Sequence, residues 1–424
     1  MEEKNVRNKI IALSGEPVSG KGTVTKLLIS ELQEKGYKKE NIHTISTGNE
    51  FRKYFNVVLD FIDCLKRDDD AGAIDLVQTQ ELQDIANNTE YREAFKKSAT
   101  TIAKNKINVR NLSIEEMNNL PELKEIRKAI DLLIDSKIAN IGKEINKEER
   151  PDEIWIIDSR LAFHNVPEAF SVRLTANPDV AAKRLLGDTT RGKEDNDYES
   201  IEEAKKAREN RKLGEQRRYL SRYGVDLLDR NNYDLIIDTS YSDPNDIADT
   251  IIRGMEYYKN NKYFHRDWTS PKTLLPMQTE RDTLGLASYT LDELRNEIAK
   301  KDFLPTMPIE VVEADGYRGI VEGHHRNFAA ASLGKTLVPY EIIAKDDERV
   351  HYGGAKANQR ISSISENNLY GHEGLIEIGE KIRKGQEATF SYEDIYPGIY
   401  EKIRNNKGCL RCNDYEDHDD DGDR

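Results

Sequence analysis

Two glycines and a lysine near the start of the chain are spaced for binding phosphate. Gly15 and Gly20 bracket a short loop, and Lys21 follows the second glycine directly. Glycine lets the main chain adopt positive φ angles and approach an anion closely, because it has no Cβ atom. The loop amides can then point at a phosphate, and the lysine adds a full positive charge. The alternative is an ordinary glycine-rich turn between a strand and a helix.

The segments on either side of this loop predict a strand and a helix. Residues 10–13 form an apolar run that is typical of a buried strand. From Thr23 onward, apolar residues recur at intervals of three and four, which is the helical period. These residues are Val24, Leu27, Leu28 and Leu32. The N-terminus of this helix, with its partial positive charge, would face the bound anion.

The sequence Gly20-Lys21-Gly22-Thr23 resembles the phosphate loop of nucleoside monophosphate kinases, especially the cytidylate kinases. The resemblance implies an α/β P-loop fold with a parallel sheet and helical lid and acceptor subdomains. It also implies ATP and Mg2+ as cofactors, with Thr23 near the metal and Lys21 stabilising the migrating phosphoryl group. The candidate nucleotide-binding residues are Gly15, Ser19, Gly20, Lys21, Gly22, Thr23 and Val24.

A second motif, residues 46–52, resembles the segment of these kinases that binds the phosphate acceptor. It follows a strand expected at residues 41–45. The resemblance implies that Thr47 and Gly48 start a helix beside the acceptor, and that Arg52 binds its phosphate through a planar guanidinium. Asn49 replaces the usual acidic residue of the family. The alternative is that Ser46 and Thr47 only cap a helix.

A third motif lies at residues 153–160, after a long stretch (53–150) whose pattern predicts an insert made mostly of helices. Residues 154–157 predict a second buried strand that ends at Asp158. A carboxylate at the tip of such a strand is suited to magnesium. The segment from Asp158 to Ala162 resembles the cytidylate kinase segment whose arginine binds the acceptor, which here is Arg160. The alternative is a strand-ending salt bridge between Asp158 and Arg160.

A fourth motif lies in the charged helix expected over residues 201–222, after a strand at 170–175 and a helix at 179–187. Residues 188–200 are polar and predict a mobile lid. The helix resembles the lid of the archaeal cytidylate kinases, which implies that Arg208 and Arg211 approach the transferred phosphoryl group. A solvated helix with internal ion pairs is the alternative. A last strand and helix are expected at 233–238 and 244–258.

A second domain is expected after a polar linker at residues 257–263. The order of its predicted elements resembles the ParB/sulfiredoxin-like domain: helix 290–300, strands 308–312 and 317–321, helix 327–333 and strand 338–343. In that family a loop at a helix N-terminus holds nucleotide phosphates. The matching residues here are Glu322, Gly323, His324, His325 and Arg326. The two histidines could instead be one core and one surface residue, and no third metal ligand accompanies them.

Composition limits the class of protein. The chain has 424 residues and a net charge of −14, which argues against general DNA binding, although the ParB-like residues could bind DNA locally. No apolar run approaches the ~20 residues needed to span a bilayer, and the cytoplasm is the expected compartment. Cys64, Cys409 and Cys412 form no disulfide framework. The acidic residues 406–424 are expected to be a disordered tail.

We therefore expect residues 1–260 to be a P-loop kinase that phosphorylates a nucleoside monophosphate, CMP or dCMP above others. Residues 261–405 would be the ParB/sulfiredoxin-like domain. One alternative is a kinase for another small molecule, including free serine through the C-terminal domain. Another is a nucleotide-sensing regulatory or DNA-associated protein.

Overall fold

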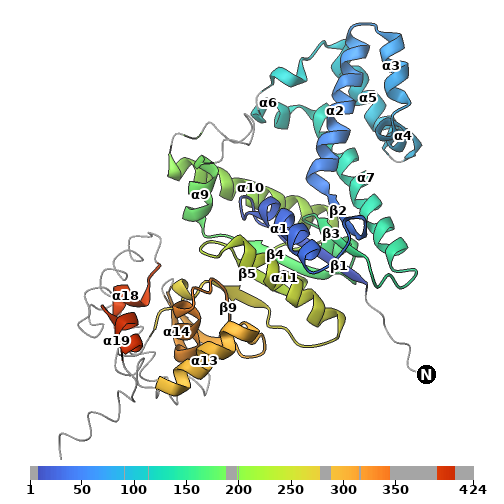
Figure 1. The fold of residues 1–424 in the computed structure, drawn as a ribbon. Coiled ribbons are helices and arrows are strands. Elements are labelled where there is room, and N and C mark those ends of the chain that lie inside the picture. Colours follow the sequence, from blue (N-terminus) through green and yellow to red (C-terminus); the bar gives the residue numbers. More distant parts are fainter. Residues whose placement is uncertain are drawn as a thin grey trace, which may run out of the picture.

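One mixed sheet runs through most of the molecule (Figure 1). The computed structural model describes residues 8–89, 91–112, 114–187, 198, 200–276, 288–314, 317–343 and 389–405. In spatial order the strands are β2 (Ile42–Ser46), β3 (Ile154–Asp158), β1 (Lys9–Gly15), β4 (Phe170–Thr175), β5 (Leu235–Asp238), β6 (Asp267–Thr269), β9 (Val338–Ile342), β7 (Ile309–Ala314) and β8 (Tyr317–Glu322). The strands from β2 to β6 are parallel, and β9 joins β6 in the antiparallel direction.

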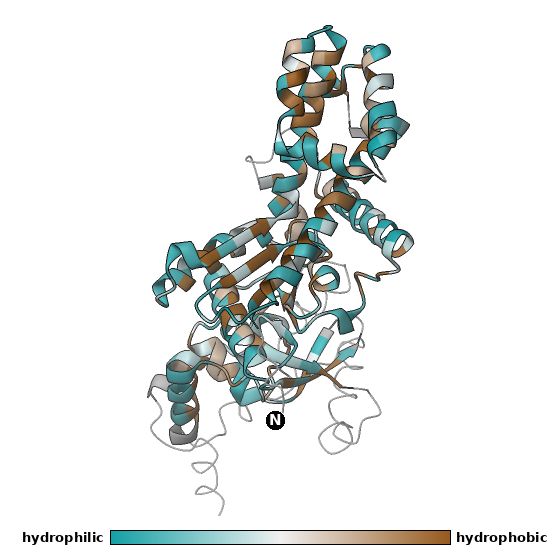
Figure 2. Ribbon diagram, turned by 90° about the vertical axis from the view of Figure 1, so that its right-hand side faces the viewer, coloured by the Kyte–Doolittle hydropathy of each residue, from teal (hydrophilic) through white to brown (hydrophobic). Residues whose placement is uncertain are grey.

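The central strand β1 is covered on both faces, which explains its unbroken apolar run. Alternate residues of a strand point to opposite faces. Ile11 and Leu13 pack with residues of α1 (Lys21–Glu34) and α11 (Pro244–Lys259), whereas Ile10 and Ala12 pack with the long helices α2 and α7. Figure 2 shows the apolar residues concentrated along the strands, while the helices alternate between apolar and polar residues. The strand predicted at residues 10–13 is confirmed.

A helical unit stands on one end of this sheet (Figure 1). It consists of α2 (Thr47–Lys66), α3 (Asp70–Val77), α4 (Gln80–Asn87), α5 (Arg92–Lys104), α6 (Ile114–Asn119) and α7 (Pro121–Ile145). Ile62, Ile102 and Ile126 come from three different helices. All three are fully buried and belong to the same hydrophobic cluster. The helical insert expected over residues 53–150 is therefore confirmed. α7 begins at Pro121, a position where proline costs no helical hydrogen bond.

The remaining helices of this half are α8 (Ala162–Asn165), α9 (Pro178–Gly187) and α10 (Ile201–Tyr223). α10 begins at Ser200, whose hydroxyl accepts a hydrogen bond from the Glu203 amide, and it ends at Gly224 with a φ of 69°. Its buried residues are Ala204 and Arg208, so very little of this helix is apolar core. Most of the lid expected at 188–200 lies outside the described residues.

The C-terminal residues continue the same sheet, which the sequence did not predict. The expected linker at 257–263 begins as the last turn of α11, and the short strand β6 then pairs with β5. Trp268 of β6 is 1% exposed and stacks on Phe264, with ring centroids 5.3 Å apart. Across this junction Asp246 accepts hydrogen bonds from the backbone amide and the hydroxyl of Thr336, at 3.0 and 2.6 Å. Residues 260–263 of the expected linker thus connect α11 to the segment before β6.

The elements predicted beyond the junction are present. They are β7, β8 and β9 with α13 (Ser288–Lys301) and α14 (His324–Ser332), followed by α18 (Tyr392–Ile395) and α19 (Ile399–Asn405). α14 begins three residues before the predicted start. The aromatic segment near the end of the chain packs into this core, where Phe328 and Tyr392 meet with ring centroids 4.7 Å apart. Within these described ranges, no helix is long and apolar enough to cross a membrane.

Candidate functional site

The loop after β1 is tightly closed, and its glycines are needed for steric reasons. A Cβ atom on Gly15 would lie 2.6 Å from the Ser19 hydroxyl and 3.2 Å from the Leu174 side chain. Gly20 has a φ of 82° and starts α1, a conformation that favours glycine. The first residue of α1 is thus Lys21, two positions before the predicted start. This places Lys21 at the end of the loop and at the positive end of the helix.

Lys21 forms an ion pair with Asp158, and sheet pairing explains why. β1 and β3 are parallel neighbours in which Leu13 pairs with Asp158, so both strands deliver their next residues to one edge. Burial lowers the pKa of Lys21, and the attraction of Asp158 opposes this shift. The edge of β2 meets the same point, because the Thr47 hydroxyl donates to the Asp158 carbonyl at 3.1 Å. The first three motifs therefore meet at the carboxyl ends of neighbouring parallel strands.

The remaining loop residues divide into exposed and buried groups. Gly22 and Thr23 are exposed on the first turn of α1. Ser19 is 1% exposed, and its hydroxyl has no hydrogen-bond partner among the described residues. Val24 is a correction: its side chain is 2% exposed within the core cluster, and its amide donates to the Gly20 carbonyl. Val24 therefore supports the helix and does not offer its side chain to a nucleotide.

The donor set fits a magnesium nucleotide. An accessible hydroxyl at Thr23 and a carboxylate at Asp158 are oxygen ligands of the kind that Mg2+ takes, usually together with phosphates. No group of three or more His, Cys, Asp or Glu side chains able to hold a metal occurs in the part of the chain that the structure describes.

The two candidate acceptor arginines already contact other side chains. Arg52 is exposed on α2, and its guanidinium donates to the side-chain amide oxygen (Oδ1) of Asn49 at 2.6 Å. Asn49 therefore still accepts a hydrogen bond from Arg52, although it lacks the charge of the acidic residue it replaces. Arg160 lies 3.1 Å from the carboxylate of Glu215 on α10. The alternative of an Asp158–Arg160 salt bridge is not seen, because Asp158 pairs with Lys21.

The two predicted lid arginines have very different surroundings. Arg208 is 3% exposed, and its guanidinium donates to the carbonyls of Pro17 and Ala176, both at 3.1 Å. It also forms an ion pair with Glu16 at 2.6 Å. Arg208 therefore fastens α10 to the phosphate loop, which corrects the expectation of a mobile lid residue. Arg211 is exposed, 3.4 Å from Glu215.

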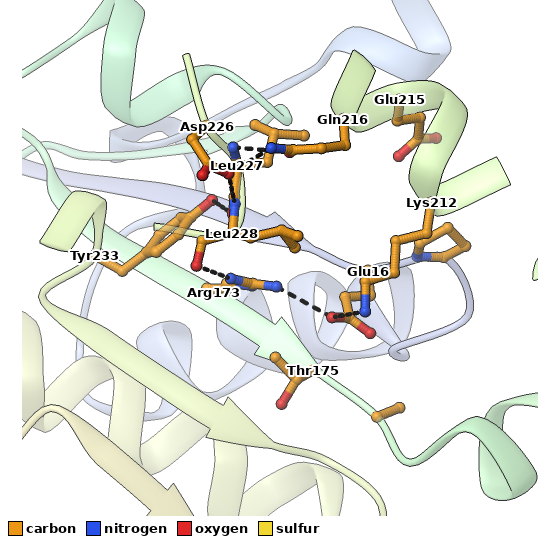
Figure 3. A network of polar contacts seen from close by, with 12 residues as sticks. Glu16, Arg173, Thr175, Lys212, Glu215, Gln216, Asp226, Leu227, Leu228 and Tyr233 are labelled. Carbon is orange, nitrogen blue, oxygen red and sulfur yellow. Dashed lines mark hydrogen bonds and ion pairs between the residues drawn. The ribbon is translucent and has the colours of Figure 1, made fainter. Parts of the chain in front are cut away.

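A charged network centred on Glu16 was not predicted (Figure 3). One oxygen of Glu16 is 3.1 Å from Arg173 of β4 and 3.2 Å from Lys212 of α10, and the other oxygen pairs with Arg208. Burial alone would raise the pKa of Glu16, but the three cations hold this pKa below its usual value. A carboxylate inside a phosphate-binding loop is visible in the sequence, and this was the signal that could have revealed the network.

A second unpredicted cluster lies between α7 and α10. Arg222 is 3.3 Å from Asp131, and the Tyr223 hydroxyl donates to Asp135 at 2.5 Å. Burial raises the pKa of both aspartates. The helical insert and the charged helix are thereby joined through α7 and α10.

At the expected second phosphate site a helix begins after a glycine, but the arginine side chain contacts main-chain carbonyls. Gly323 has a φ of 97° and starts α14, directly after Glu322. The guanidinium of Arg326 donates to the carbonyls of Met307 and Pro308, and burial lowers its pKa. His324 is buried and His325 is half-buried. Arg326 is thus held by main-chain carbonyls, which corrects the expectation that it converges freely on an anion. Cys409 and Cys412 lie outside the described residues.

Comparison with known proteins supports the kinase resemblance. The model of the cytidylate kinase-like family matches residues 71–241, a range that excludes the phosphate loop. A cytidylate kinase of Sulfolobus acidocaldarius is 35% identical over 146 residues, covering 34% of this chain and 69% of that protein. One of Pyrococcus abyssi is 32% identical over 136 residues, covering 32% and 65%. An S-adenosylmethionine-dependent nucleotide dehydratase of Lacinutrix mariniflava is 34% identical over 121 residues, covering 28% and 23%.

Proposed function

Because this chain belongs to the cytidylate kinase-like family, we propose that it transfers the terminal phosphoryl group of ATP to a nucleoside monophosphate. CMP or dCMP is the preferred acceptor, in line with the two relatives that are cytidylate kinases. One observation carries the proposal: the phosphate-loop lysine, Lys21, meets Asp158 at the sheet edge where Arg160 also emerges. A cation, a metal-binding carboxylate and an acceptor arginine are thereby brought to one place.

In this mechanism the side chains position phosphates and neutralise their charge. The backbone amides of Gly20 and Lys21 and the Lys21 ammonium bind the terminal phosphates of ATP. Thr23 and Asp158 would hold Mg2+, which would neutralise phosphate charge. Arg52 and Arg160 bind the acceptor phosphate in line, so that one of its oxygens replaces the ADP oxygen on the transferred group. The products are ADP and a nucleoside diphosphate, and an ionised acceptor needs no general base.

Binding must break contacts that the structure contains. The Lys21–Asp158 pair has to separate for the lysine to reach a phosphate and the carboxylate to reach a metal. Arg160 likewise has to leave Glu215 or share its donors with the acceptor. In these exchanges phosphates take the place of carboxylates beside Lys21 and Arg160. In the free enzyme each of these two cations is paired with a carboxylate instead.

A transfer assay with a panel of acceptors tests this function. The full chain is incubated with Mg-ATP and each common nucleoside monophosphate, and with free serine as a separate arm. We expect turnover with CMP or dCMP, and loss of that turnover in Lys21→Met. Binding of ATP without phosphorylation of any monophosphate would contradict the proposal.

The serine arm addresses a second candidate function, kinase activity of the C-terminal residues. The observation that favours it is the left-handed Gly323 at the start of α14, which places a helix N-terminus at His324 and His325. If phosphoserine forms in Lys21→Met but not in His325→Ala, the C-terminal half is the kinase of serine. A ParB-like nucleotide sensor would instead bind CTP without turnover.

A further inference from the structure

Glu16 is a carboxylate placed inside a loop that is built to bind anions. It follows Gly15 directly, and its amide donates to the Leu174 carbonyl at 2.9 Å, so its backbone is fixed to β4. Its side chain is 11% exposed and accepts from cations of two different elements, β4 and α10 (Figure 3). An anion here would repel a nucleotide phosphate unless the surrounding cations outnumber it. They do, because three cations face one carboxylate.

The three cations are not equally free to move. Arg208 is buried and also bonded to two main-chain carbonyls. Arg173 donates to the Leu228 carbonyl at 3.4 Å, and its guanidinium lies 5.5 Å from the centroid of the Tyr233 ring. Lys212 is 26% exposed, and its ion pair in the described structure is with Glu16. Lys212 is therefore the cation that can exchange Glu16 for a phosphate without breaking other contacts.

Position on the helix supports the same choice. Lys212 is one turn after Arg208, so both face the loop, and the anchoring of Arg208 fixes where Lys212 emerges. Arg160, Arg173, Lys212 and Tyr233 line one small cavity of 30 Å³ beside Gly15.

We propose that Glu16 is a positioning residue that holds Lys212 beside the phosphate-binding loop, and that Lys212 is the cation of α10 that contacts the transferred phosphate. This inference rests on the proposed phosphotransferase function. It assigns to Lys212 the role that the sequence suggested for Arg208 and Arg211. Arg208 serves instead as the fixed attachment of the helix.

A double-mutant cycle in the full chain tests this inference. Lys212→Ala should lower kcat for the CMP reaction by about 10²-fold, the size of effect expected when one donor to a developing charge is removed. Glu16→Gln should lower kcat by about 10-fold yet leave ATP binding at least as tight as in the wild type, because a repelling charge has gone. The double variant should be no slower than Lys212→Ala, because Glu16 acts through the lysine.

Lys206 provides the matched control, because it is exposed on the same helix and points elsewhere. Lys206→Ala should retain wild-type kcat. Equal losses of kcat and ATP affinity in Glu16→Gln, accompanied by a lower Tm, would mean that Glu16 is only structural and would overturn the proposal. Wild-type kcat in Lys212→Ala would overturn it as well, and a Tm near that of the wild type would show that this variant folds.

A second readout does not depend on the acceptor. Acetylation of lysines by an amine-reactive ester is followed by peptide mass spectrometry, with and without Mg-ATP. ATP should slow labelling of Lys212 at least tenfold and leave Lys206 unchanged, and Glu16→Gln should speed Lys212 labelling in the free protein. If no monophosphate is phosphorylated but this pattern holds, the proposed function fails and the role of Glu16 stands. If ATP binds and Lys212 is not protected, the inference fails alone.

Discussion

The guanidinium Nε of Arg160 lies 3.1 Å from a carboxylate oxygen of Glu215. The two residues come from separate elements, the turn after β3 and the middle of α10, and both side chains are largely buried. The candidate acceptor-binding arginine is thus held by an ion pair to the charged helix α10. Binding of an acceptor phosphate therefore competes with a carboxylate that is already present.

Substitutions of this pair should change acceptor binding in opposite directions. Arg160→Ala should raise the KM for the acceptor at least tenfold, because charge-assisted bonds to phosphate are lost. Glu215→Gln should lower this KM, because the competing carboxylate is removed. Steady-state kinetics at saturating ATP measure both. A rise of KM in both variants would show that the pair serves the fold and does not compete with the acceptor.

The Lys21–Asp158 pair predicts two distinct catalytic losses. Lys21→Met should reduce kcat by roughly 10²- to 10³-fold, because one preorganised charge on the developing phosphate is lost. Asp158→Asn should instead raise the magnesium concentration needed for half-maximal rate. Titration of Mg2+ at fixed ATP separates the two variants. An unchanged magnesium dependence in Asp158→Asn would remove this residue from the metal site.

Gly15 should not tolerate a side chain. Gly15→Ala places a methyl group 2.6 Å from the Ser19 hydroxyl and against Leu174, and such overpacking costs about 1–3 kcal/mol of stability. Gly214→Ala is the matched control, because no atom lies within 4 Å of its added Cβ and alanine favours the helix by about 0.5–1 kcal/mol. Thermal unfolding should thus show a lower Tm for the first variant and a slightly higher one for the second.

Trp268 should be essential to the stability of the whole chain. It is 1% exposed on β6, between strands of the two halves, and Trp268→Ala should cost about 3–5 kcal/mol. Leu220→Ala, at a site that is 51% exposed on α10, should stay within about 0.5 kcal/mol of the wild type. Chemical denaturation measures both. A small effect of Trp268→Ala would argue that the halves are joined only loosely.

Glu31 gives stability a defined dependence on pH. Burial, with the charge of Asp249, raises the pKa of Glu31 to about 7 from 4.5. The folded chain therefore retains a proton that the unfolded chain loses between these values, and stability falls as pH rises through this window. Glu31→Gln should raise the Tm at pH 8 and leave it nearly unchanged at pH 4.5.

The sequence predicted most of the strands because a parallel sheet buried on both faces requires unbroken apolar runs, such as residues 10–13 and 154–157. It could not predict β6, whose three residues are too few to show a period. It also assigned Arg208 to the transferred phosphoryl group, because nothing local indicates a partner 191 positions away, the Pro17 carbonyl. Local patterns thus determined the elements, while contacts between distant segments determined what the charged residues do.

The strand order has a consequence for how the chain can lose its structure. β5 pairs with β6, and the residue that follows β5 is Thr239. The Thr239 hydroxyl donates to the Ser19 carbonyl in the phosphate loop at 3.0 Å. Hydrogen bonds thus run from the C-terminal strands to the nucleotide-binding residues without a flexible break. The two halves should consequently melt as one cooperative body, and an N-terminal fragment cut before β6 would leave an unsatisfied strand edge open to aggregation.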